Sequence, residues 1–294
     1  MRALVLGSGG QLGTEIVSEL RRKGMSVVGL GRDELDITDE DAIHSCFTRH
    51  KPGWVINTAA YNYVDLAEKE AEKAMRVNGV AVYYLAIACR ERGATLMHFS
   101  TDHVFDGEKV EPYVEEDTPN PPSVYGVSKL AGEMYVRASL EQHYVIRVAG
   151  VFGPAGRYTK RGNFPELILK KALASEPLKV VEDFFATPTY APALASRCVE
   201  LLENGKFGLY HIGGGVKISW YHYALKILEA AELEADIQPT NHREFKTPAR
   251  RPRNAELSNA KVESLGSPKM PSLEVALSEY MKFRQSMRPK KRHG

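Results

Sequence analysis

Short apolar runs alternate with longer amphipathic stretches through the first half of the chain. The runs are nearly continuous in apolar residues, which is typical of strands buried on both faces. They cover residues 3–6, 26–30, 54–57 and 94–99. Between them, apolar residues recur at helical spacing, for example at Leu12, Ile16 and Leu20. The alternation predicts a doubly wound parallel sheet, with ligands at the carboxyl ends of the strands.

Helix ends in this half are marked by glycine and by capping residues. A long helical stretch is predicted over residues 67–92, and Gly93 is expected to end it. Earlier in the chain, Thr38 with Asp41 three residues later predicts a capping box at the start of a helix that carries Ile43 and Phe47.

The second half of the chain loses this regular alternation. Asn163 is expected to cap a helix over residues 165–174, and Ser219 to begin another. Further helices are expected over residues 190–203 and 272–284. We therefore predict an α/β chain, with a Rossmann-type domain over residues 1–150 and a smaller, partly helical substrate domain over 151–294. Segments such as 187–215 are expected to pack back on the first domain.

Composition and charge narrow the class of protein without identifying it. The 294 residues are 43% hydrophobic and 26% charged, with a formal net charge of +2. This is ordinary for a globular protein and argues against nucleic acid and membrane as partners. The basic run at residues 288–293 is expected to be a solvated tail. Because neither an export signal nor an apolar span of about 18 residues is apparent, a cytoplasmic location is expected.

The three cysteines, Cys46, Cys89 and Cys198, are far apart in the sequence and form no metal-binding or redox pair. Each lies in an apolar helical pattern, so we expect buried, reduced thiols.

A glycine-rich turn links the first strand to the first helix. Gly7, Gly10 and Gly13 give the spacing Gly-x-x-Gly-x-x-Gly, and Gln11 and Leu12 lie between the last two glycines. Glycines there permit a tight turn and let the backbone approach a pyrophosphate at the helix N-terminus. The turn predicts a dinucleotide site.

The residues after the second strand bear on the choice of dinucleotide. Arg32 stands where an acidic residue would hold a ribose 2′-hydroxyl, and an Arg can instead contact a 2′-phosphate. This favours NADPH, with NADH as the alternative. Asp36 and Ile37 follow in the same segment.

A Tyr-x-x-x-Lys pentad supplies the candidate chemistry. Tyr125 and Lys129 lie four residues apart, on one face of a helix. An unperturbed Tyr titrates near about 10, but a nearby cation favours its phenolate, so the pair can transfer a proton. Ser100 and Thr101 end the fourth strand. We expect these hydroxyls, the glycine turn and the pentad at one edge of the sheet.

Several longer motifs resemble those of the extended short-chain dehydrogenase/reductase family. They read N-T-A-A-Y-N-Y-V-D-L-A-E at residues 57–68, S-T-D-H-V-F-D-G at 100–107 and P-S-V-Y-G-V-S-K-L-A-G-E at 122–133. They are most similar to the dTDP-4-dehydrorhamnose reductase branch of that family. Further similarity lies at residues 163–164, 188–190, 208–212, 219–221 and 250–257, so the resemblance covers most of the chain.

The resemblance implies NADPH-dependent reduction of the C4 ketone of a deoxy nucleotide sugar, namely dTDP-4-dehydrorhamnose to dTDP-rhamnose. Tyr125 would be the general acid, Lys129 would lower the Tyr125 pKa and bind the nicotinamide ribose, and Thr101 would orient the substrate carbonyl. The expected cofactor-binding residues are Gly7, Gly10, Gln11, Leu12, Gly13, Arg32, Asp36, Ile37, Ala59, Ala60, Tyr61, Ser100, Tyr125 and Lys129. The expected substrate-binding residues are Val64, Asp65, Thr101, Asp102, Asn163, Arg250 and Arg251.

A cationic loop is a second candidate for substrate binding. Arg250, Arg251 and Arg253 lie among two prolines, and guanidinium groups suit bidentate contacts with a diphosphate. A solvated basic turn is the alternative.

Three departures from the family pattern concern the sugar pocket and a metal site. Gly150 stands where the family usually has a Trp, His103 replaces a Tyr, and residues 183–186 read D-F-F-A in place of D-Q-F-G. The last change removes part of a magnesium site that related reductases use in pairing, so no metal is expected, although a homodimer stays open.

Two alternative functions also stay open. One is a reductase of another nucleotide-linked keto-sugar, which Gly150 favours. The other is an NADP(H)-binding regulatory subunit, because the beta subunit of methionine adenosyltransferase resembles these reductases.

Overall fold

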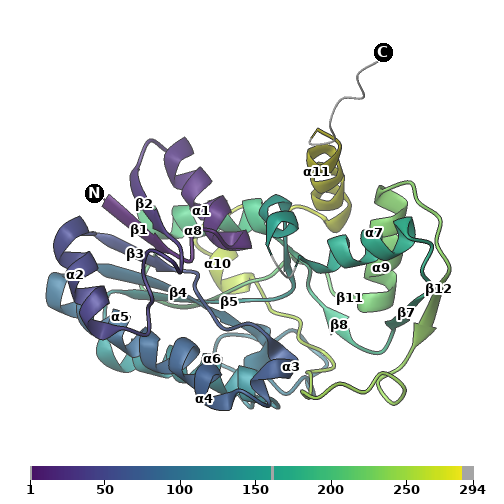
Figure 1. The fold of residues 1–294 in the computed structure, drawn as a ribbon, viewed down its shortest axis with the longest axis horizontal. Coiled ribbons are helices and arrows are strands. Elements are labelled where there is room, and N and C mark those ends of the chain that lie inside the picture. The colour runs from purple at the N-terminus through teal and green to yellow at the C-terminus, as the bar shows by residue number, and fades with distance from the viewer. Residues whose placement is uncertain (1, 160–161, 287–294) are drawn as a thin grey trace.

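A computed structural model describes residues 2–159 and 162–286. A parallel sheet forms the centre of the larger of its two parts (Figure 1). Its six strands run in the order β10-β5-β4-β3-β1-β2, and every neighbouring pair is parallel. They are β1 (Arg2–Leu6), β2 (Ser26–Leu30), β3 (Trp54–Asn57), β4 (Thr95–Thr101), β5 (His143–Val148) and β10 (Gly208–Ile212). The predicted doubly wound parallel sheet is confirmed.

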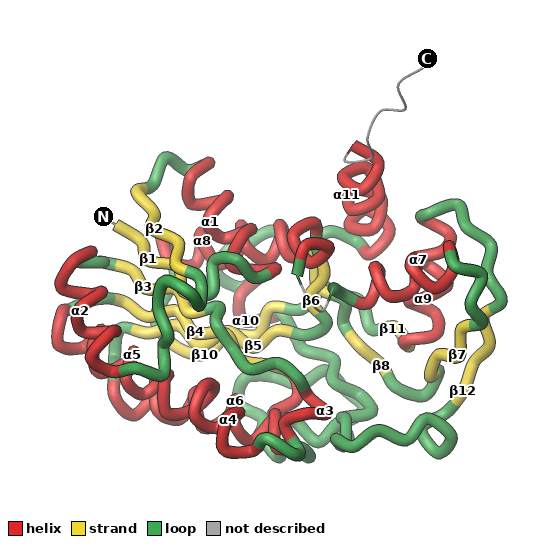
Figure 2. Tube along the Cα trace, viewed as in Figure 1, coloured by secondary structure: helices red, strands yellow, loops and turns green. Residues whose placement is uncertain are grey.

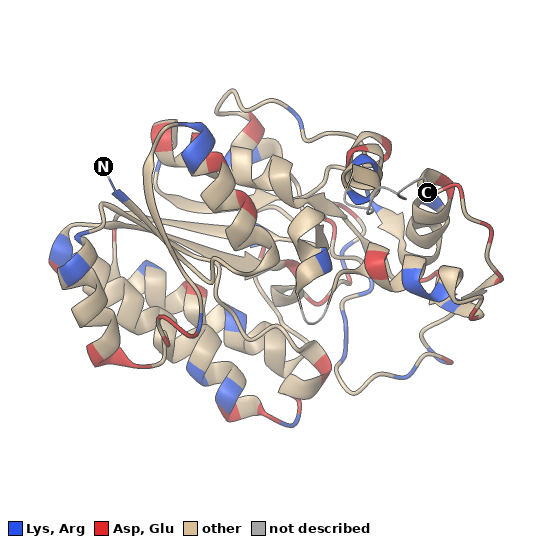
Figure 3. Cartoon of the chain, turned by 45° about the horizontal axis from the view of Figure 1, so that its top comes forward, with Lys and Arg blue, Asp and Glu red and all other residues tan. Residues whose placement is uncertain are grey.

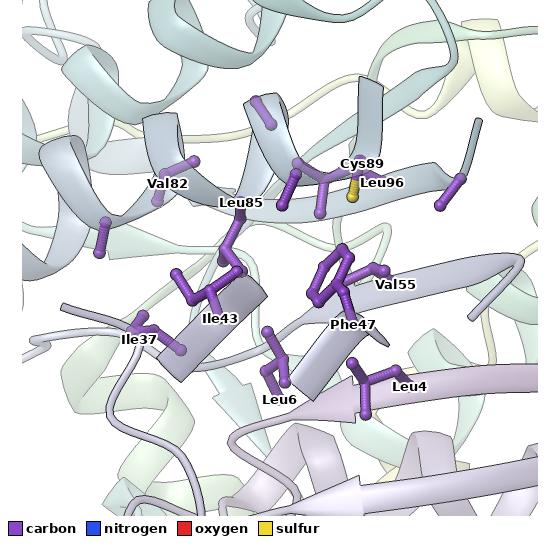
Figure 4. Close-up of a cluster of buried hydrophobic side chains, with 14 of the residues drawn as sticks. Leu4, Leu6, Ile37, Ile43, Phe47, Val55, Val82, Leu85, Cys89 and Leu96 are labelled. Carbon is purple, nitrogen blue, oxygen red and sulfur yellow. The ribbon is translucent and has the colours of Figure 1, made fainter. Parts of the chain in front are cut away.

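Helices cover both faces of this sheet (Figure 1). One layer contains α1 (Gln11–Arg22) and α8 (Ala191–Asn204), and the other contains α2 (Glu40–His50), α5 (Ala81–Arg92) and α6 (Val124–Ser139). Figure 4 shows the core under the second layer, where Leu4, Val55 and Leu96 of the sheet meet Phe47 and Leu85. Because helices bury both faces, the strands appear in the sequence as continuous apolar runs.

The order of the strands places a topological switch between β1 and β3. The chain leaves β1 for β2 on one side and later returns to the other side of β1 as β3. The loops that follow these neighbouring strands diverge, and the crevice between them is where doubly wound sheets bind ligands.

The stretch predicted as one helix over residues 67–92 is divided in the structure. The elements are α3 (Val64–Ala67), α4 (Ala71–Met75), the π-helix η1 (Arg76–Val80) and α5. Helical residues run without a break from Ala71 to Arg92, so the prediction is confirmed over most of its length and is wrong only at its start and in the π-helical segment. Apolar periodicity reports neither the short turn before α4 nor the extra residue per turn that a π-helix contains.

The helix after β2 begins with a different cap from the one predicted. Asp39 is the N-cap of α2, and its Oδ1 accepts from the backbone N of Ala42 at 3.0 Å. Thr38 instead donates its hydroxyl to Asp36 at 2.8 Å. The Thr38–Asp41 capping box was wrong, because Asp39 is the nearer carboxylate acceptor for the first turn.

The second half of the chain forms a smaller unit beside the sheet, with long loops between its elements (Figure 2). It contains α7 (Phe164–Leu173), β7 (Leu178–Val181), β8 (Phe185–Ala186), β11 (Ile218–Ser219), α9 (Trp220–Ala230), β12 (Ile237–Thr240) and α11 (Leu273–Ser286). Shorter elements elsewhere along the whole chain are η2 (Asp102–Val104), β6 (Val151–Phe152), η3 (Pro154–Tyr158), β9 (Thr189–Tyr190) and α10 (Ala260–Glu263). Asn163 and Ser219 are N-caps, as predicted. The domain division at residue 150 stays a prediction.

Three further sequence predictions concern the cysteines, membrane-spanning helices and the basic run near the end of the sequence. Cys46, Cys89 and Cys198 are buried thiols, as predicted. Over residues 2–159 and 162–286, no helix combines the length and apolar character needed to cross a membrane. The basic run at 288–293 lies outside the described residues.

Candidate active site

The glycine turn between β1 and α1 packs tightly against the end of β3. Gly7 has a φ of +74°, and a Cβ placed on it would lie 2.7 Å from the backbone N of Ala59. A Cβ on Gly13 would lie 2.4 Å from the carbonyl O of Gly7. Only glycine fits at both positions. The backbone can therefore approach an anion closely at the N-terminus of α1.

Two asparagines hold the loop after β3, which contains the predicted cofactor residues Ala59, Ala60 and Tyr61. The side-chain O of Asn57 accepts from Ala59 N at 3.1 Å, and Asn78 of η1 exchanges two 2.8 Å hydrogen bonds with the backbone of Tyr61. Asn78 was not among the residues predicted from the sequence. The sequence does contain a sign of it, because Asn78 is a polar residue on an otherwise apolar helical face. In the structure Asn78 is 1% exposed.

The predicted cofactor residues after β2 differ in exposure. Arg32 and Asp36 are exposed, and Asp36 accepts from both the backbone N and the hydroxyl of Thr38. These hydrogen bonds lower the pKa of Asp36. Ile37 is buried in the core shown in Figure 4. Arg32 is thus an exposed cation two residues after the end of β2.

Helix α6 carries Tyr125 in its first turn and Lys129 one turn later. Ser123 is the N-cap, and its Oγ accepts from Gly126 N at 3.2 Å. The Lys129 side chain is 3% exposed, and its Nζ donates to the carbonyl O of Phe99 in β4 at 2.5 Å. Burial disfavours the ammonium and lowers the pKa of Lys129 to about 8. The ammonium is therefore fixed against the central strand.

Thr101 ends β4 and lies two residues before His103, which contacts Tyr125. Thr101 donates its hydroxyl to Asp102 Oδ1 at 2.9 Å and accepts from the backbone N of His103 at 3.2 Å. The His103 ring stands edge-on to the Tyr125 ring, with centroids 5.5 Å apart. Burial raises the pKa of Asp102. Ser100 Oγ is buried and has no hydrogen-bond partner among the described residues.

Asn163 is engaged with the glycine turn. Its Oδ1 accepts from Glu166 N at 3.0 Å, and its Nδ2 donates to Gln11 Oε1 at 2.9 Å and to the carbonyl O of Gly153 at 3.2 Å. Gln11 in turn donates to the carbonyl O of Val151 at 2.8 Å. The sequence predicted Gln11 for cofactor and Asn163 for substrate, and the structure joins the two side chains.

Asp65 and Arg251 meet between the two halves of the chain. Arg251 Nη1 donates to Asp65 Oδ1 at 3.0 Å, and Nη2 donates to Oδ2 at 2.7 Å. The backbone N of Ala249 also donates to Asp65, at 3.2 Å. Val64 precedes Asp65 in α3 and is half-buried, whereas Arg250 is exposed. One of the predicted diphosphate-binding arginines is thus paired with a predicted substrate-binding carboxylate.

The third arginine of the cationic loop is also paired. Arg253 Nη2 lies 3.3 Å from Asp183 Oδ2, and His242 Nδ1 lies 2.5 Å from the same oxygen. Asp183 opens the D-F-F-A segment that departs from the family pattern. Figure 3 shows basic and acidic residues interspersed along the chain.

The described residues fit a dinucleotide. The glycine turn has a cradle that a Cβ would fill, and the buried Ser100 hydroxyl at the end of β4 lacks a partner in the described chain. No group of three or more His, Cys, Asp or Glu in the described ranges could hold a metal ion. The predicted roles of the site residues themselves stay predictions.

Comparison with known proteins places the chain among sugar-nucleotide enzymes. The model of the RmlD substrate binding domain family matches residues 1–285. The spore coat polysaccharide biosynthesis protein SpsK of Bacillus subtilis is 35% identical over 285 residues, which are 97% of this chain and 98% of that protein. A dTDP-4-dehydrorhamnose reductase of Streptomyces griseus is 35% identical over 95% of this chain and 92% of its own.

A solved structure extends the comparison to the fold. The dTDP-4-dehydrorhamnose reductase of Bacillus anthracis, solved in complex with NADP, is 30% identical and superimposes with a TM-score of 0.91. The match covers 96% of this chain and 98% of that one.

Proposed function

We propose that this chain, which belongs to the RmlD substrate binding domain family, reduces the C4 ketone of a deoxy nucleotide sugar with NADPH. The proposed substrate is dTDP-4-dehydrorhamnose and the product dTDP-rhamnose, in line with the named activity of relatives that match nearly the full chain. The observation that carries the proposal is the buried Lys129 ammonium, one helical turn from Tyr125 and bound to the strand that ends in Thr101.

The proposed chemistry divides between cofactor and protein. NADPH supplies the hydride when bound. Tyr125 donates a proton to the oxygen that becomes negative as the ketone is reduced, and Lys129, as a nearby cation, favours the resulting phenolate. Thr101 orients the ketone, with its hydroxyl turning from Asp102 to the substrate oxygen.

The remaining contacts position the two ligands. Gly7, Gly10 and Gly13 bring the backbone close to the pyrophosphate, and Arg32 meets the 2′-phosphate that distinguishes NADPH from NADH. Arg250 and Arg251 bind the diphosphate of the nucleotide sugar, and Arg251 exchanges its contact with Asp65 for one with a phosphate. Asn163 supports the site through Gln11, since both of its polar atoms already have partners.

The deciding experiment follows NADPH absorbance with purified protein and dTDP-4-dehydrorhamnose. Tyr125→Phe removes the proton donor, so we expect turnover to fall by about 10²-fold or more. NADPH affinity, measured by fluorescence titration, should remain within a few-fold of the unmodified protein. Absence of NADPH oxidation by the unmodified protein with this sugar and with a panel of other nucleotide-linked keto-sugars would refute the proposal.

A second candidate substrate class is favoured by Gly150. This residue lacks the aromatic side chain that the family usually places there, which leaves room for a sugar with a different substituent pattern. The same panel of keto-sugars separates the candidates, because a higher kcat/KM with another member would reassign the substrate and keep the reaction.

A further inference from the structure

A buried ion pair lies one turn beyond Lys129 on α6. Glu133 and Arg147 are 0% and 1% exposed. Arg147 Nε donates to Glu133 Oε1 at 2.9 Å, and Nη2 donates to Oε2 at 2.7 Å. Removing two charges from water is costly, and their mutual attraction repays the cost only with good geometry. A buried pair is therefore weak grounds for a purely stabilising role, and its position needs a separate reason.

The surroundings of Arg147 hold Glu133 in one place. The Arg147 guanidinium lies over the Phe105 ring at 5.0 Å, and Nη1 lies 3.3 Å from His211 Nε2. Burial lowers the pKa of His211 to about 3, so the ring is neutral and accepts from Arg147 through Nε2. His211 Nδ1 then donates to the carbonyl O of Tyr113 at 3.0 Å. With Arg147 fixed on several sides, the Glu133 carboxylate has little freedom to turn away from α6.

Glu133 lies four residues after Lys129, so the two side chains leave the same face of α6 toward the sheet. Lys129 is bound to Phe99 of β4, and Glu133 is bound to Arg147 of β5, which pairs with β4. Both groups are buried, and a negative charge one helical turn away favours the ammonium where water cannot screen it.

The other titratable groups in this part of the site do not replace Glu133. Tyr125 lies on α6 itself, and Asp102 lies on η2 with its hydrogen bond to Thr101. His98 of β4 is fully buried, and burial followed by the Lys129 charge holds its pKa well below the usual range, so the ring is neutral. Burial lowers the pKa of Lys129, and the negative charge of Glu133 acts against that lowering.

We propose that Glu133 is a positioning residue for the Tyr125–Lys129 pair: anchored by Arg147, its carboxylate keeps the buried Lys129 ammonium charged and directed toward β4. The link to catalysis rests on the proposed function. The effect on the charge of Lys129 does not, and can be measured without turnover.

The test titrates Lys129 by NMR with isotope-labelled lysine, its signal assigned by its loss in Lys129→Met. The double variant Glu133→Leu/Arg147→Met replaces the pair by apolar side chains, an exchange that buried pairs often tolerate, and Glu133→Gln leaves Arg147 as an unpaired cation. We expect the pKa of Lys129 to fall by about one pH unit in the double variant and further in Glu133→Gln. Lys23→Ala/Glu203→Ala removes a surface ion pair, 2.9 Å long, between the residue that follows α1 and a residue of α8. This control should leave the pKa of Lys129 unchanged.

The rate profile gives the second readout. If the Lys129 cation is needed, kcat/KM falls as pH rises through the Lys129 pKa, and the double variant should move this decline to lower pH by the same amount. An unchanged Lys129 pKa in a folded double variant would overturn the inference. If the pKa of Lys129 is lowered in the double variant but the unmodified protein reduces no keto-sugar, the inference about Glu133 stands and the proposed function is refuted. Failure of the inference can therefore be told apart from failure of the proposed function.

Discussion

Gly150 shows how backbone conformation limits the choice of residue at one position. It follows β5 with a φ of +52°, and a Cβ there would lie 3.4 Å from Pro188 Cα. The contact is ordinary, but the left-handed conformation costs an L residue about 1–2 kcal/mol. Gly150 is therefore fitted to its backbone, and an aromatic residue could not be restored here without strain.

Two substitutions at Gly150 should distinguish the cost of its positive φ from the cost of steric contact by an added side chain. Gly150→Ala should lower the free energy of unfolding by about 1 kcal/mol, measured by denaturant titration, because the left-handed conformation is retained at a cost. Gly150→Asn is the matched control and should cost less, since Asn tolerates this region best among non-glycine residues. Equal losses in the two variants would mean that steric contact, rather than φ, sets the penalty.

At the scale of elements, polar side chains at the starts of helices cap the helix, and one of them also links it to another element. Ser123, Asn163 and Ser219 accept hydrogen bonds from the first turns of α6, α7 and α9. Asn163 has in addition a donor that reaches Gln11 in the glycine turn. The start of α7 is thereby tied to the predicted cofactor site.

Two variants at Asn163 should divide these functions. Asn163→Ala removes the cap and the link, and should cost about 1 kcal/mol in the free energy of unfolding, together with weaker NADPH binding in a fluorescence titration. Asn163→Asp keeps an N-cap acceptor but loses the amide donor to Gln11. It should retain most of the stability and show the weakened binding. NADPH affinity unchanged in both variants would contradict a role for the link.

The whole molecule is held together in part by contacts between its two halves. The Asp65–Arg251 pair is one of these, with side chains 42% and 30% exposed. At such exposure, solvent screening limits the contribution of an ion pair, even with bidentate geometry.

A double-mutant cycle with Asp65→Ala and Arg251→Ala should give a coupling free energy of up to about 1 kcal/mol for unfolding. The coupling should shrink in high salt, because the charges are partly screened. Arg250, one position earlier and exposed, is the matched control and should show almost no coupling to Asp65. Comparable coupling for Arg250 and Arg251 would show that general charge, rather than the bidentate contact, joins the halves.

Two buried histidines should make the whole fold sensitive to mild acid. Burial holds the pKa of His98 and His211 below the unfolded value of 6.5. Below that pH the unfolded chain binds more protons than the folded one, so stability decreases as pH falls from 6.5. Each neutral histidine contributes a slope of up to about 1.4 kcal/mol per pH unit.

Denaturant titrations between neutral pH and the range where carboxylates begin to titrate, above about 5, measure this slope. His211→Gln can keep a donor for Tyr113 and an acceptor for Arg147 but cannot take up the proton. It should therefore reduce the slope, and the remainder should come from His98 and from His143, whose pKa burial also lowers. The same slope in His211→Gln would assign the acid sensitivity to other groups.

The sequence by itself determined the features that depend on local pattern. Apolar runs and helical periodicity specified the strands and most helices, because burial on one or two faces fixes the spacing of apolar residues. Short spacings placed Gly7, Gly10 and Gly13 at one turn and put Tyr125 and Lys129 on one helical face. Where two local signals competed, as at Thr38 and Asp39, the pattern was insufficient.

The tertiary structure alone decided which polar side chains satisfy one another. Asn163 meets Gln11 across 152 residues, and Arg251 meets Asp65 across 186. Glu133 and Arg147, on a helix and a strand, become a buried pair only when α6 packs on β5. No periodicity records such pairings, since each depends on how distant elements are brought together and on which groups lose their water when they meet.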